Sequence, residues 1–162
     1  MQPEDTPPTS TLVATAEAYM QVFTTLNPET ISEILSQDYK HDLAPSSTNF
    51  PAPFNRESFM AHIKNLSTLL RSFPVRSKQT WPNPSLRQVL IWADSETIFH
   101  DHLRDSDGEE WTSRGEYMWL LTMDKTGHKV EKVLEFLDSK SVDEIRDLMT
   151  RALARKKALD ES

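Results

Sequence analysis

The chain has 162 residues, a formal net charge of −7 and no cysteine, with 37% hydrophobic and 27% charged residues. This length suits a single domain with a real core, and the absence of cysteine excludes disulfides, thiolate catalysis and cysteine-ligated zinc while favouring a cytoplasmic location. The acidic balance argues against a nucleic-acid partner, and no apolar run approaches the ~18 residues that a membrane span requires.

Helical patterns dominate the first half of the chain. Residues 1–10 are polar and proline-rich, so we expect a disordered tail followed by one domain over residues 11–162. Asn27-Pro28 predicts the start of a short helix, because Asn is a good N-cap and proline suits the first helical position. Two longer helices are predicted on either side of it by apolar residues spaced three and four apart. Their stripes are Leu12, Ala16, Tyr19, Phe23 and Leu26, and Phe59, Ile63, Leu66, Leu70 and Phe73.

From Val75 onward the pattern changes to strands and turns. Two prolines in residues 80–84 predict a short edge piece there. Ser141 and Glu144 form a predicted capping box for a final helix. Helices grouped before an antiparallel meander favour an α+β fold, whose curved antiparallel sheet wraps around the N-terminal helices as a cone-shaped barrel with a blind cavity. The meander strands are expected at residues 86–93, 96–103, 111–123 and 130–137, with a hairpin turn at Asp94-Ser95.

The strand expected at residues 111–123 has one strongly aromatic face. Alternation places Trp111, Ser113, Tyr117 and Trp119 on that face, which we expect to point inward. The Tyr117 hydroxyl would then lie in a hydrophobic chamber, where it can donate or accept a hydrogen bond. The alternative is a core tyrosine whose hydroxyl bonds to the backbone.

Glu135 stands among apolar neighbours near the end of the last predicted strand. It is flanked by Leu134 and Phe136, a poor environment for a surface carboxylate. A carboxyl group buried among apolar side chains is suited to work as a general acid or base. Alternatively, Glu135 pairs with Arg114 or Lys132 and leaves the core to its neighbours.

Histidines offer two further candidates. His41 shares one face of an extended segment with Tyr39 and suits proton transfer near neutral pH, although a lone histidine is often only a packed or capping residue. His100 and His102 have the spacing of two metal ligands on a strand, but no third ligand accompanies them. We therefore expect no metal site.

Three segments, together with the order of elements, resemble the SnoaL-like group of the nuclear-transport-factor-2-like superfamily. They are YKHDLAPSS at 39–47, SRGEYMWLLTMDKTGHKV at 113–130 and VLEFLDSK at 133–140. The resemblance covers residues 11–155 and is nearest to small fungal isomerases and cyclases of secondary metabolism. It implies a dead-end cavity for a hydrophobic polycyclic substrate, usually in a homodimer, without a metal or an organic cofactor.

The function expected from this resemblance is a cofactor-free isomerase or cyclase acting on a polyketide, meroterpenoid or alkaloid intermediate, with dehydration also possible. A non-catalytic module of the same fold, binding a small molecule or acting as a dimerising scaffold, is the alternative. Homodimerisation is expected through the outer sheet face, with Met118, Leu120 and Leu134. Glu135, Tyr117 and His41 are the expected catalytic residues, and Tyr39, Phe99, Trp111, Trp119 and Ser113 the expected substrate contacts.

Overall fold

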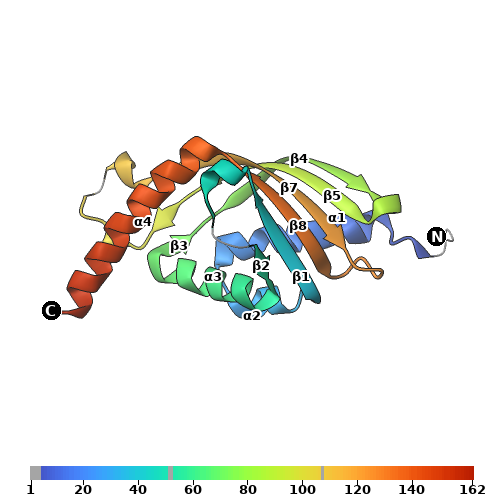
Figure 1. Ribbon diagram of the computed structural model, residues 1–162, viewed down its shortest axis with the longest axis horizontal. Coiled ribbons are helices and arrows are strands. Elements are labelled where there is room, and N and C mark those ends of the chain that lie inside the picture. Colours follow the sequence, from blue (N-terminus) through green and yellow to red (C-terminus); the bar gives the residue numbers. More distant parts are fainter. Residues whose placement is uncertain (1–4, 51–52, 107) are drawn as a thin grey trace.

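The computed structural model describes residues 5–162 except 51–52 and 107 (Figure 1). Its helices are α1 (Thr9–Thr25), α2 (Pro28–Ser32), α3 (Arg56–Leu69) and α4 (Ser139–Asp160). Its strands are β1 (Leu35–Ala44), β2 (Phe54–Asn55), β3 (Leu70–Ser72), β4 (Val75–Asn83), β5 (Gln88–Glu96), β6 (Ile98–Phe99), β7 (Arg114–Met123) and β8 (Val130–Leu137). None of the helices in this described part combines the length and apolar character needed to cross a membrane.

The main sheet is mixed, so the expectation of a purely antiparallel sheet was wrong. Its strand order is β2-β1-β8-β7-β5-β4, and β1 runs parallel to β8, with His41 opposite Val133 and Leu43 opposite Glu135. The expected barrel is instead an open, curved sheet, because β2 and β4 lie at opposite ends of the strand order and do not pair. The α+β class and the cone shape were predicted correctly (Figure 1).

A bulge in β8 decides which of its residues face the core. Pairing with β7 advances two residues on β8, from Val130 to Lys132, for one residue on β7. The extra residue puts Val130 and Val133 on the same side of the sheet, and Glu135 follows them inward, only 8% exposed. Phe136 is consequently 52% exposed. Simple alternation counted from Val130 gives the opposite assignment.

Strand boundaries differ from the predicted ones around β5. The expected turn at Asp94-Ser95 is wrong, because both residues continue β5 and pair with Glu116 and Gly115 of β7. Of the strand expected at 96–103, Glu96 belongs to the end of β5, and Ile98–Phe99 form β6, which pairs with β3 in a separate two-stranded sheet. The edge strand β4 is longer than predicted and accommodates Pro82, because an edge strand has one side without ladder hydrogen bonds.

Two helices begin earlier than expected. Helix α1 starts at Thr9, so the last two residues of the expected tail are helical, while residues 1–4 lie outside the described residues. Helix α4 is capped by Asp138, whose carboxylate accepts the backbone N–H of Ser141. Ser141 is therefore not the cap, because an aspartate three residues earlier serves that purpose equally well.

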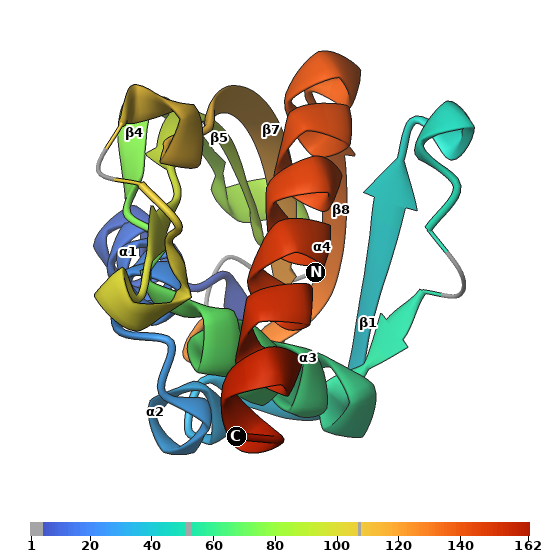
Figure 2. The same ribbon diagram turned by 90° about the vertical axis from the view of Figure 1, so that its left-hand side faces the viewer.

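Helix α4 runs across the open end of the sheet and closes it on that side (Figure 2). Its first turn approaches β7 at Gly115, where a Cβ would lie 2.3 Å from Ser141 Oγ, 2.9 Å from Ser141 Cβ and 3.0 Å from the Tyr117 hydroxyl. Only glycine leaves room for this contact. Gly115 thus fixes where α4 starts and what lies beside Tyr117.

The outer face of the sheet is partly apolar. Leu134 is 45% exposed there, and Met118 and Leu120 are half-buried. Homodimerisation through this face remains a prediction.

We expect Gly115→Ala to destabilise the protein by about 1–3 kcal/mol, because the new methyl group overpacks the contact between α4 and β7. The free energy of unfolding from urea denaturation measures the change. Gly108→Ala is the control, since its Cβ would have no neighbour closer than 3.6 Å. Equal effects of the two substitutions would contradict the proposed close contact.

Candidate active site

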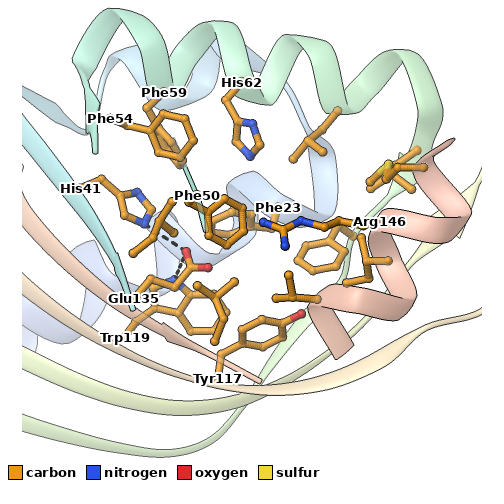
Figure 3. Close-up of a pocket in the computed structure, with 18 residues that line it drawn as sticks. Phe23, His41, Phe50, Phe54, Phe59, His62, Tyr117, Trp119, Glu135 and Arg146 are labelled. Atoms are coloured by element: carbon orange, nitrogen blue, oxygen red, sulfur yellow. Dashed lines mark hydrogen bonds and ion pairs between the residues drawn. The ribbon is translucent and has the colours of Figure 1, made fainter. Parts of the chain in front are cut away.

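A cavity of about 230 Å³ lies between the sheet and helices α3 and α4 (Figure 3). Most of its wall is apolar, with aromatic rings from Phe23, Phe54, Phe59 and Trp119. Titratable groups reach it from the strands and from both helices. They are His41, His62, Tyr117, Glu135 and Arg146.

Glu135 occupies the sheet side of this cavity and is held at one oxygen. Its Oε1 accepts the indole N–H of Trp119 at 2.8 Å and lies 3.1 Å from Nε2 of His41. Its Oε2 has no hydrogen bond to any described residue. One carboxylate oxygen is therefore fixed by the protein, and the other is left for a ligand. The expected alternative pairing with Arg114 or Lys132 is replaced by these two bonds.

Two buried tyrosines continue the hydrogen-bond chain behind His41. The Tyr39 hydroxyl lies 2.8 Å from His41 Nδ1 and 2.7 Å from the Tyr19 hydroxyl. Burial raises the pKa of both tyrosines well above the ordinary value, so both keep their protons. Tyr19, Tyr39 and His41 are at most 1% exposed, so this hydrogen-bond chain is buried.

The proton positions follow from satisfying every donor in this chain. In one arrangement Tyr19 donates to Tyr39, Tyr39 donates to His41 Nδ1, and the Nε2–H of His41 donates to Glu135 Oε1. Every donor of this buried chain then has an acceptor, so none pays the cost of an unmade hydrogen bond.

Strand pairing builds this arrangement. Tyr39 and His41 are two residues apart on β1 and share one face. Trp119 of β7 and Leu43 of β1 are the direct register partners of Glu135 on β8. Three adjacent strands therefore bring the donors and the carboxylate to one place.

Tyr117 lines the cavity beside the start of α4. Its hydroxyl lies 3.5 Å from Ser141 Oγ, so its partner is a side chain and not the backbone. Burial raises its pKa, and the hydroxyl remains a proton donor.

The other expected substrate contacts lie away from the cavity wall. Tyr39 sits behind His41, in the hydrogen-bond chain. Phe99 and Trp111 pack against each other, with ring centroids 5.3 Å apart, because β6 pairs with β3 and Trp111 belongs to a 3₁₀ turn before β7. Ser113 also precedes β7. Among the expected contacts, only Trp119 lines the cavity, so direct ligand contact by the other four has no support in this geometry.

The sequence analysis missed His62 on α3. Its ring stacks on Phe54, with centroids 4.7 Å apart, and has no hydrogen bond to any described residue. Burial lowers its pKa, an effect opposed by Glu135 and reinforced by His41. The sequence did contain one indication that His62 lies near the cavity. It stands three residues after Phe59, so it lies beside the apolar stripe of this helix.

The described residues contain no group of three or more His, Asp or Glu side chains placed to hold a metal ion. His100 and His102 lie with ring centroids 5.5 Å apart, and His100 Nε2 bonds to the carbonyl oxygen of Ser67.

Removing the Tyr39 hydroxyl tests the hydrogen-bond chain. We expect Tyr39→Phe to cost about 1–3 kcal/mol of unfolding free energy, since His41 Nδ1 loses its closest donor. Tyr19→Phe removes a hydroxyl that bonds to Tyr39 and lies at a longer 3.4 Å from His41 Nδ1, so it should cost less, about 1 kcal/mol. Urea denaturation measures both values, and ¹⁵N chemical shifts of His41 report its tautomer. A larger loss from Tyr19→Phe would contradict the assigned proton positions.

His62 should make stability depend on pH. Because its pKa is lower in the folded state than its ordinary value of about 6.5, the unfolded chain binds the proton more readily. Stability should therefore fall as pH drops below about 6.5 toward the folded pKa, and His62→Gln should reduce this loss. Urea denaturation at several pH values measures it, with His128→Gln, in an exposed turn, as control. An unchanged pH profile in His62→Gln would rule out this contribution.

No sequence-family model matches the chain, and neither does any curated protein. Solved structures do. The BvnE pinacolase from Penicillium brevicompactum matches with a TM-score of 0.73 and 19% identity, over 87% of this chain and 92% of that one. AusH from Aspergillus nidulans matches with a TM-score of 0.69 and 23% identity, over 82% of this chain and 87% of that one. PrhC from Penicillium brasilianum matches with a TM-score of 0.71 and 14% identity, over 91% of each chain.

Identities this low establish a common architecture and carry no residue roles with them. The three matches cover between 82% and 91% of this chain. The chain therefore has the SnoaL-like, nuclear-transport-factor-2-like fold.

Proposed function

We propose that this protein is a cofactor-free isomerase or cyclase that acts on a secondary-metabolite intermediate by general acid–base catalysis. The observation that carries the proposal is the hydrogen bonding of the two carboxylate oxygens of Glu135. Two donors hold its Oε1, while Oε2 has no hydrogen bond to any of the described residues and lies at the wall of an apolar cavity. A carboxylate fixed in this way is positioned to accept a proton from a bound molecule.

In the proposed mechanism, Glu135 Oε2 removes a proton from a carbon or a hydroxyl group of the substrate. The electron pair moves onto a substrate oxygen, where the Tyr117 hydroxyl donates a hydrogen bond to the developing negative charge. Glu135 then returns the proton at a different position, so an isomerisation or cyclisation leaves the mass unchanged. The N–H groups of His41 and Trp119 keep Oε1 in place throughout. Such proton transfer contributes about 10²–10⁴-fold to a rate.

The similarity in fold supports the general reaction class. One of the matching structures is named a pinacolase, and another a putative polyketide cyclase. Because the pinacolase is only 19% identical to this chain, its substrate and residue roles do not carry over, and both are inferred from the cavity of this protein.

The alternative is a binding module without catalysis. It would place Glu135 in an ion pair with a surface cation and fill the interior with side chains. A volume of about 230 Å³ is below the ~300 Å³ usual for sites of drug-sized ligands, but well above the ~150 Å³ that accommodates benzene. The cavity thus suits a compact ligand of one or two rings. The unpartnered oxygen of Glu135 favours the enzyme over the binding module.

Glu135→Gln is the direct test. The amide oxygen can still accept from His41 and Trp119, so fold and ligand binding should survive while the base is lost. We expect product formation to fall by about 10²-fold or more. Glu131→Gln on the same strand, outside the cavity wall, is the matched control.

Mass-resolved metabolite profiles of the source organism supply the readout, with the gene deleted and then restored as wild type, Glu135→Gln or Glu131→Gln. An accumulated intermediate of the same mass as the product indicates isomerisation or cyclisation, whereas one extra water indicates dehydration. Full restoration by Glu135→Gln would remove Glu135 from the mechanism. No metabolite change after deletion, under conditions of expression, would favour the binding module.

A further inference from the structure

Arg146 of α4 brings a guanidinium to a mostly apolar cavity that also contains the carboxyl group of Glu135 (Figure 3). Its side chain is exposed to solvent, yet it also contributes to the cavity wall, which places it at the entrance. Two contacts hold the guanidinium. One N–H donates to the carbonyl oxygen of Thr48, and the group lies over the Phe50 ring, 5.0 Å from its centroid.

No carboxylate of the described residues lies within ion-pair distance of Arg146. Arg151, one and a half turns further along α4, is in the opposite situation, with Asp105 at 2.8 Å and Glu110 at 3.6 Å. A guanidinium has five N–H donors, and a ring beneath it leaves the donors at its edges accessible. Arg146 is thus held in position with donors available, and no carboxylate in the described part of the chain neutralises its charge.

Besides His62 and Tyr117, the cavity wall carries an acidic group and a cationic group that come from different elements. Glu135 lies on the sheet side, bonded to β1 and β7, and Arg146 lies at the entrance on α4. Apolar side chains, among them Phe59 and Leu66, form the wall between them. A ligand that carries its own carboxylate would be repelled from Glu135 and attracted to Arg146. Its rings would then enter first, with the reacting position directed toward Glu135.

We propose that Arg146 binds a carboxylate of the substrate, so that the substrate class is a compact carboxylic acid with one or two rings. The inference rests on the proposed function only for the reacting end, because recognition at Arg146 requires no turnover. Planar, bidentate binding of a carboxylate is the interaction that a guanidinium provides and a lysine does not.

The test compares two isosteric probes, 2-naphthoate and 2-naphthamide, by isothermal titration calorimetry. We expect the wild type to bind naphthoate about tenfold more tightly than naphthamide. This ratio is the affinity that one charge-assisted hydrogen-bonded pair contributes at a partly exposed site. Arg146→Gln should remove this preference, and Arg146→Lys should keep only part of it. Arg155→Gln, on the exposed side of the same helix, is the control and should keep the full preference.

Arg146 could instead serve only to fasten α4 to the segment around Thr48. In that case Arg146→Gln would lower the melting temperature but leave the ratio of the two affinities unchanged, which would overturn the proposal. Equal binding of both probes by the wild type, or binding of neither at millimolar concentration, would also overturn it. In the Glu135→Gln variant, naphthoate should still bind. The affinities for the two probes therefore test the role of Arg146, whereas product formation tests the proposed function.

Discussion

A carboxylate in an apolar cavity is the constraint around which this molecule is built. Moving a charged group out of water is costly unless hydrogen-bond donors replace the lost solvent. Here the indole of Trp119 and the imidazole of His41 supply them, from strands on either side of β8. The parallel pairing of β1 with β8 brings His41 within reach, so the mixed topology of the sheet is a requirement of the site. Tyr39 and Tyr19 extend the support by fixing the imidazole tautomer.

Much of the architecture could be predicted because it depends on local periodicity. The inward face of β7, with Tyr117 and Trp119, follows from alternation along one strand. The inward orientation of Glu135 does not, because a bulge shifts the phase between Val130 and Val133. Pairing between β1 and β8 joins residues about ninety positions apart, and nothing in the local pattern of either strand encodes it. The open edge of the sheet escaped prediction for the same reason.

The site itself was predictable where a polar residue interrupts an apolar pattern on a strand, as Glu135 does. Helix-borne site residues gave weaker signals. His62 and Arg146 both stand next to apolar stripes, where a polar residue ordinarily indicates a solvated face. Which side of such a helix meets a cavity depends on packing between α3, α4 and the sheet, a tertiary property. Phe99 and Trp111 were expected to contact the substrate, but they lie on short elements and pack against each other in the core, away from the cavity.

The two charged ends of the cavity differ in what they can contribute to a reaction. Arg146 is exposed, so solvent screens it, and its interaction with a substrate would be nearly the same before and during the reaction. Uniform binding of this kind lowers KM and leaves kcat unchanged. Glu135 is almost fully buried, and in the proposed mechanism it takes up the substrate proton only during the reaction, so its contribution would belong to the transition state. Under the two proposals, recognition lies on a helix at the entrance and chemistry on the sheet. A new substrate range would then evolve through changes on α4, while the hydrogen bonds around Glu135 remain unchanged.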